Sequence, residues 1–198
     1  MSLLTTENTT QSGRNVLAAL VTVGALILQV AVFNRLPLPG QVTPDLVLLT
    51  VVALALLNGE MVGAVTGFCA GLAADIIPPA DHTIGRYALV YCLIGYASGL
   101  LSDSMDRSST VPFVAVAAGA LFGTLLYAAV GMLLGDPRAT GAVIARIVPV
   151  QVLYDVLASP FVIWVVMRLT RRAERAKSPR RRDLAVPGYR SRARERAL

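Results

Sequence analysis

The 198-residue chain has few of the side chains from which catalytic and metal sites are built. It contains one histidine, His82, and two cysteines, Cys69 and Cys92, which both lie inside apolar runs. Two such thiols predict neither a disulfide framework nor a metal site, and they are interpreted as packing residues. No second carboxylate, Ser-His pair, Cys-His pair or HExxH motif adjoins a candidate residue. Enzymatic catalysis and a bound cofactor are therefore not expected.

Charge is also scarce, and this excludes an ordinary soluble domain. Only 15% of the residues are charged, 55% are hydrophobic and the mean hydropathy is +0.64. A soluble domain of this length would be far more polar. The apolar residues gather in six blocks, most of them near the roughly 20 residues that cross a bilayer as helix. These blocks are 16–33, 46–57, 61–77, 87–101, 111–134 and 143–167. They predict an all-α integral membrane protein, a compact bundle of six transmembrane helices.

The second block is short, and two interpretations of it stay open. It forms either a short or tilted helix of its own or half of a helical hairpin with the third block. Thr43 is placed to cap a helix, Pro44 suits the first helical position and Asp45 suits the positive end of the helix dipole. A helix from Pro44 to Gly59 is therefore expected.

Three segments are predicted along the chain. Residues 1–13 form a cytoplasmic N-terminal segment, residues 14–170 the six-helix transmembrane domain, and residues 171–198 a basic, largely disordered cytoplasmic tail. The first apolar block is expected to remain as a membrane helix, because no small-residue cleavage pattern follows it before Arg35.

Basic residues predict the orientation. From Arg168 onward the chain carries 12 of its 18 Lys and Arg residues and 3 acids. The positive-inside rule places this tail in the cytoplasm, and six crossings bring the N-terminus to the same side. Arginines next to a membrane exit attract anionic lipid head groups by about 1 kcal/mol each. The predicted lipid contacts are Arg171, Arg172, Arg180, Arg181 and Arg182. Nucleic-acid binding is not expected, because the excess of basic over acidic residues lies entirely in this tail and is not interleaved with a series of stacking aromatics.

Glycines recur at four-residue intervals in the apolar blocks. Such spacing lets the backbones of membrane helices approach closely. The predicted packing residues are Gly63, Gly67 and Gly71, then Gly95 and Gly99, then Gly119 and Gly123, with Gly131 and Gly135 as a further pair.

Asp75 continues the first glycine series by one more interval and so faces the bundle. A carboxylate at the membrane centre costs about 2.5 to 3.5 kcal/mol and needs a partner. His82 and Arg86 follow on the same side of the membrane, and Arg86 opens the next helix. An Asp75–Arg86 pair is predicted to join the third and fourth helices. The alternative is a site for a partner or ligand.

Asp155 is the second predicted buried acid. Gln151 precedes it by four residues and therefore shares its helix face. Pro160 is expected to kink this helix and to free backbone carbonyls near the acid. Asp155 and Gln151 are candidate partner or helix-pairing residues.

Three runs together resemble a known family. They are PDLVLL from Pro44, GFCAGLAAD from Gly67 and HTIGRYALVY from His82. In this order and spacing they resemble the rod shape-determining protein MreD family over residues 14–170. The resemblance implies a non-enzymatic role in lateral cell-wall synthesis, with MreC as a direct partner and RodA and a class B penicillin-binding protein as indirect ones. It also implies a fold similar to the substrate-binding subunits of energy-coupling-factor transporters. The long basic tail departs from the family pattern.

The alternative function is that of a vitamin-binding transporter subunit. Such subunits often carry an Ala-x-x-x-Ala arrangement in the first helix, which this chain lacks. Its predicted outer loops also offer a single cluster of polar and aromatic groups. The cluster consists of His82, Arg86, Tyr87 and Tyr91.

Overall fold

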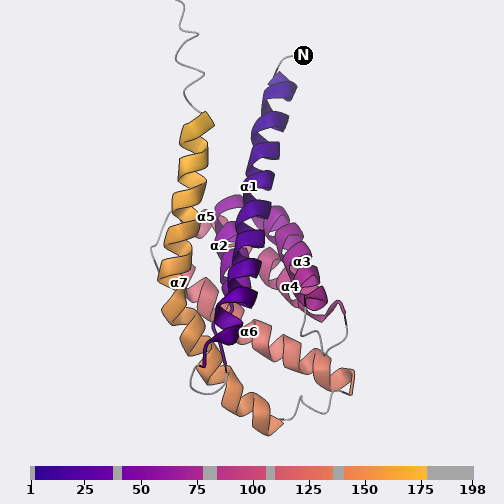
Figure 1. Cartoon of the computed structure of the whole chain (residues 1–198). Helices are drawn as coiled ribbons and strands as arrows, with labels where there is room; N and C mark the ends of the chain where they lie inside the picture. The colour runs from indigo at the N-terminus through magenta and orange to yellow at the C-terminus, as the bar shows by residue number, and fades with distance from the viewer. Residues whose placement is uncertain (1–2, 38–41, 78–83, 106–109, 136–140, 178–198) are drawn as a thin grey trace, which may run out of the picture.

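The computed structural model describes residues 3–37, 42–77, 84–105, 110–135 and 141–177, and all regular structure in them is helical. Each of the six apolar blocks corresponds to one helix of 13 residues or more, and these six are called the long helices to set them apart from η1 and α5. The elements are α1 (Leu3–Ala31), the short 3-10 helix η1 (Phe33–Arg35), α2 (Leu46–Asn58), α3 (Glu60–Ile76), α4 (Arg86–Gly99), α5 (Ser102–Met105), α6 (Val111–Leu133) and α7 (Gly141–Lys177). Figure 1 shows that α1 begins and α7 ends at the same end of the molecule. The opposite end, where α1 ends and α2 and α4 begin, is called the cap end below.

The short second block forms the centre of the bundle. Eleven of the 13 residues of α2 are buried, and α1, α3, α4, α6 and α7 all contact it. Burial on every side explains why this helix is apolar all round. α2 and α3 are joined only by Gly59, whose φ of 89° favours glycine, so they also form the hairpin that was the alternative interpretation.

The predicted start of this helix is wrong by two residues. α2 begins at Leu46, and Asp45 is its N-cap, because the Asp45 carboxylate accepts the Leu48 N–H at 2.9 Å. Thr43 and Pro44 therefore precede the helix. An aspartate in this position satisfies an otherwise free N–H group, which is a stronger effect than the favourable backbone angle of proline at the first turn.

α3 and α4 pack through their backbones. A Cβ added at Gly63, Gly67 or Gly71 would collide with the backbone carbonyls of Gly95, Tyr91 or Tyr87. The glycines of α4 lie equally close to α3, since a Cβ at Gly95 would meet the Gly63 carbonyl and one at Gly99 would meet the Glu60 backbone. The two antiparallel helices are thus in contact over most of their length.

The glycines of α6 have other surroundings. Gly119 and Gly123 face side chains, chiefly that of Ile94, so α6 approaches α4 less closely. The predicted pair of Gly131 and Gly135 is wrong, because Gly135 lies beyond the end of α6 with a φ of 72°, and a Cβ added there would meet nothing within 4 Å. Gly135 therefore serves to end the helix.

α7 continues through both of its prolines, Pro149 and Pro160, as far as Lys177. Pro160 leaves the carbonyl of Val156 without an amide partner. The buried hydroxyl of Ser159 donates to this carbonyl at 2.8 Å. The carbonyl expected to be free near Asp155 is therefore already satisfied.

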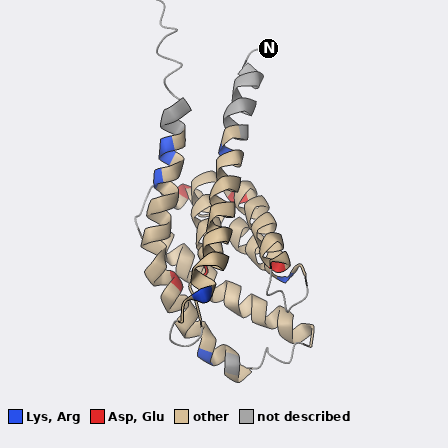
Figure 2. Ribbon diagram, viewed as in Figure 1, with Lys and Arg blue, Asp and Glu red and all other residues tan. Residues whose placement is uncertain are grey.

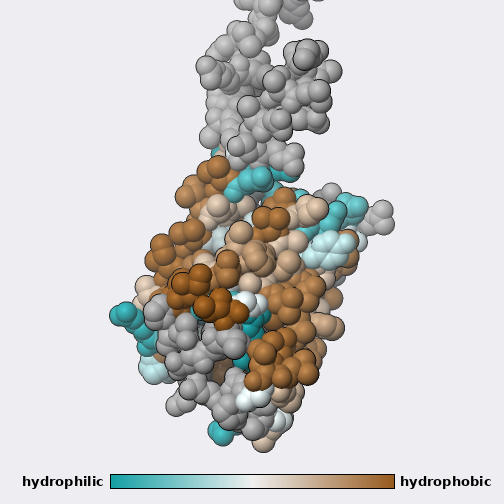
Figure 3. Space-filling model, turned by 90° about the vertical axis from the view of Figure 1, so that its right-hand side faces the viewer, coloured by the Kyte–Doolittle hydropathy of each residue, from teal (hydrophilic) through white to brown (hydrophobic). Residues whose placement is uncertain are grey.

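Length and hydropathy qualify three of the described helices to cross a membrane: residues 13–35, 111–133 and 144–173. α2 is apolar but shorter, at 13 residues, and α3 and α4 have 17 and 14 residues. The side of the molecule seen in Figure 3 is broadly hydrophobic, and Figure 2 shows few charged residues between the two ends of the bundle. These features describe a helical membrane protein. The count of six spans stays a prediction.

Candidate functional site

Asp75, at the end of α3, is fully buried against the start of α4. Its carboxylate accepts backbone N–H groups of Gly85 at 2.9 Å, Tyr87 at 3.1 Å and Ala88 at 3.1 Å. The first N–H groups of a helix lack partners within it and form the positive end of its dipole. Asp75 therefore caps α4 from a different helix, and this connects α3 to α4.

Arg86 is buried at the same helix start, with 4% of its surface exposed. Its Nε donates to the Tyr127 carbonyl at 2.8 Å, and its guanidinium carbon lies 3.5 Å from the centre of the Tyr127 ring. A Cβ on Gly131, one turn further along α6, would collide with the guanidinium. Arg86 thus connects α4 to α6. Its ion pair with Asp75 stays a prediction, and His82 lies outside the described residues.

A second set of polar groups surrounds the start of α2. Asp155 of α7, which is also fully buried, accepts the Asp45 N–H at 2.6 Å. Gln29 of α1 accepts the Leu46 N–H at 2.8 Å through Oε1. The hydroxyl of Tyr91, from α4, donates to the Asp45 carboxylate. Side chains from α7 and α1 thus accept the N–H groups of Asp45 and Leu46, while the N-cap Asp45 accepts that of Leu48 and is itself held by Tyr91.

Gln151 lies where the sequence places it, one turn before Asp155. Its Nε2 donates to the Thr43 carbonyl at 3.0 Å and is 3.3 Å from Asp155 Oδ2. From the sequence, Asp45 was expected only to interact with the helix dipole and Tyr91 only to belong to an outer cluster, and Gln29 was not identified. The available signal was a buried helix start that needed acceptors.

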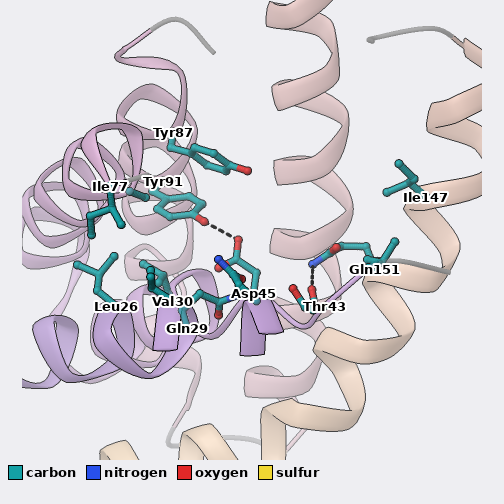
Figure 4. Close-up of a pocket in the computed structure, with 14 residues that line it drawn as sticks. Leu26, Gln29, Val30, Thr43, Asp45, Ile77, Tyr87, Tyr91, Ile147 and Gln151 are labelled. Atoms are coloured by element: carbon teal, nitrogen blue, oxygen red, sulfur yellow. Dashed lines mark hydrogen bonds between the residues drawn. The ribbon is translucent and has the colours of Figure 1, made fainter. Parts of the chain in front are cut away.

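A cavity of about 410 Å³ adjoins this polar cluster at the cap end. Figure 4 shows Tyr87, Tyr91 and Asp45 on one side of it and Gln151 and Ile147 on the other. The rings of Tyr87 and Tyr91 are 5.4 Å apart, and Tyr127 of α6 lies 4.5 Å behind Tyr87. The site combines one partly exposed carboxylate, phenol and amide groups, and apolar side chains.

The other end of the bundle carries basic residues on α7. The Arg168 guanidinium lies 4.9 Å from the Trp164 ring centre, and Arg171 and Arg172 are exposed beside it. A second cavity, of about 420 Å³, is lined by Trp164, Met167, Arg168, Arg171 and Arg172. Figure 2 shows basic residues of α7 and of the early part of α1 at this same end. Arg180, Arg181 and Arg182 lie outside the described residues.

In the part of the chain that the structure describes, neither a group of metal ligands nor a pair of bonded cysteines is present. No group of three or more His, Cys, Asp or Glu side chains there is placed to hold a metal ion. Cys69 and Cys92 are free thiols.

A buried central helix, backbone contact through glycines, cross-helix caps and a hydrophobic outer surface define an α-helical membrane protein. Comparison with protein families matches residues 11–172 to rod shape-determining protein MreD. The chain belongs to the MreD family, as the three sequence runs indicated. No curated protein and no solved structure matches it.

Proposed function

We propose that the protein is a non-enzymatic scaffold of the cell-wall elongation complex. In this proposal it binds MreC directly and supports lateral peptidoglycan synthesis by RodA and a class B penicillin-binding protein indirectly. The observation that carries the proposal is the family match over residues 11–172, because that family acts in rod shape determination. The same match favours the scaffold over a vitamin-transport subunit.

The chemistry of the buried acids supports a scaffold more than a catalyst. Asp75 and Asp155 accept hydrogen bonds from backbone N–H groups at helix starts. A catalytic acid or base needs to reach a substrate proton. Carboxylates that hold helix ends in place instead give the bundle a fixed shape, which a partner protein can recognise.

We propose further that all six long helices cross the membrane and that both termini are cytoplasmic. The common end of α1 and α7 supports this arrangement. The basic side chains at that end fit the positive-inside rule and an anionic lipid surface. α2 and α4, the shortest of the six, would be accommodated by local thinning of the bilayer and by their packing inside the bundle.

Co-purification tests the proposal. The tagged full-length chain is extracted in mild detergent from membranes of its own organism, and MreC is detected by immunoblotting. An unrelated tagged multi-pass protein is the control. MreC should co-purify with the chain and not with the control protein. Depletion of the chain should make rod-shaped cells round. Folded chain that retains no MreC, or depleted cells that stay rod-shaped, would contradict the proposal.

A further inference from the structure

We propose that the cavity at the cap end is a binding site for a small organic cation, an amine carried on an apolar or aromatic body. This inference goes beyond the scaffold role and does not depend on it.

The cavity has the construction of a ligand site. At about 410 Å³ it falls within the usual range for small-molecule pockets, about 300 to 1,000 Å³. Its lining comes from α1, η1, α3, α4, α7 and the start of α2, so six elements fix its shape. Apolar side chains such as Leu26, Val30 and Ile77 form much of the wall, and a few polar groups converge on it.

The charge of the lining selects a cation. Asp45 is the single charged side chain among the described residues that line the cavity. It keeps part of its surface exposed, whereas Asp75 and Asp155 are fully buried. Arg86 of α4 is not part of the lining and contacts Tyr127 of α6. Arg35 and Arg146 adjoin the lining residues Asn34 and Ile147 in the sequence but are not part of the lining either. Among the described lining residues an anion would therefore meet a carboxylate and no basic side chain.

Asp45 has capacity for one more donor. Its carboxylate accepts the N–H groups of Val47 and Leu48 and the hydroxyl of Tyr91. A carboxylate offers about four acceptor positions, so one remains for a ligand. A bond from an ammonium group to this carboxylate would be charge-assisted and roughly twice as strong as a neutral one.

The aromatic wall fits the same class of ligand. Tyr87 and Tyr91 line the cavity with their rings tilted by 55° to each other. Faces of aromatic rings attract organic cations. In Figure 4 the Tyr87 and Tyr91 rings lie next to each other on the α4 side of the cavity.

Three probes of similar size and different charge show whether the charge of the ligand decides its affinity. They are benzylamine, benzyl alcohol and benzoate. Each is titrated into the full-length chain in lipid nanodiscs, and binding is followed by saturation-transfer NMR of the probe. Benzylamine should bind about tenfold more tightly than benzyl alcohol, and benzoate more weakly than both. Absence of saturable benzylamine binding, or equal binding of the three probes, would overturn the proposal.

Variants locate the bound probe. Asp45→Asn keeps a good helix cap but removes the charge, so benzylamine should fall to the affinity of benzyl alcohol. Ala74→Leu fills the cavity and should abolish binding of both. Ala73→Leu is the matched control, because Ala73 lines a separate groove between α1 and α3. Benzylamine binding that survives Ala74→Leu, or is lost equally in Ala73→Leu, would place the site elsewhere.

Discussion

The buried acids of this chain act on helices other than their own. Asp75 belongs to α3 and caps α4, and Asp155 belongs to α7 and holds the N–H of Asp45 at the start of α2. Both acids are fully buried, and a buried N–H group that loses its acceptor costs about 1 to 3 kcal/mol. The acids are therefore the groups that make the short inner helices α2 and α4 possible in a membrane.

Replacement of Asp75 should destabilise the protein strongly. Asp75→Ala leaves three backbone N–H groups of α4 without their acceptor, with an expected loss of about 2 to 4 kcal/mol. The measurement is thermal unfolding in detergent. Asp103→Ala, which removes an exposed acid from α5, is the control and should change little. Similar melting of the two variants would show that the cap carries no stability.

A double-mutant cycle tests the predicted ion pair at the same helix start. Asp75→Ala and Arg86→Ala should each lower the melting temperature, and the double variant should lose less than the sum of the two, because neither charge is left buried alone. A coupling energy within about 0.3 kcal/mol of zero would show that Asp75 and Arg86 do not form a stabilising ion pair. The backbone cap formed by Asp75 would stand in either case.

Among the elements, α3 and α4 behave as one unit because their backbones touch. Gly67→Ala should therefore destabilise by about 1 to 3 kcal/mol, since its Cβ would collide with the Tyr91 carbonyl. Gly24→Ala in α1 is the matched control, because nothing lies within 4 Å of the added Cβ. The control should be neutral or stabilising, since alanine favours a helix over glycine by about 1 kcal/mol. Melting curves in detergent compare them, and equal stability of both variants would refute close packing at Gly67.

The positions of the helices could be predicted from the sequence, but some of their ends could not. The apolar blocks identify six long helices because burial and lipid contact both favour apolar residues. The start of α2 was misplaced because the Asp45 cap works together with side chains from other helices. Gln29 and Asp155 accept the N–H groups of Leu46 and Asp45, which are 17 and 110 residues away. The Tyr91 hydroxyl donates to the Asp45 carboxylate, which is 46 residues away.

The residues of the candidate site that could be predicted are those with a local signal in the sequence, and the missed ones depend on partners distant in the sequence. Asp75, Asp155 and Gln151 were identified because a polar residue in an apolar block needs a function or a partner. Asp45 precedes its block, so the sequence suggested only a local role for it. Its place beside the cavity follows from the convergence of α1, α4 and α7, which no local pattern contains.

For the whole molecule, the orientation is directly testable. A reporter that is active only in the cytoplasm should work after Leu198 and fail after Gly40, because the basic end of the bundle is expected inside. Expression levels of the two fusions, measured by immunoblotting, are the control. The reverse pattern would invert the protein, and activity at both sites would mean that the number of spans between them is even.

The 110 residues that separate Asp45 from Asp155 also have a consequence for biosynthesis. A ribosome makes about 5 to 20 residues per second, so α2 enters the membrane about 5 to 20 s before the acid that holds its start exists. During this interval the nascent chain carries an incomplete helix start and an acid, Asp45, in an apolar surrounding. A chain whose synthesis stalls before α7 lacks Asp155 and cannot satisfy the Asp45 N–H at the start of α2. Such a chain should be recognised by the proteases that remove unassembled membrane proteins.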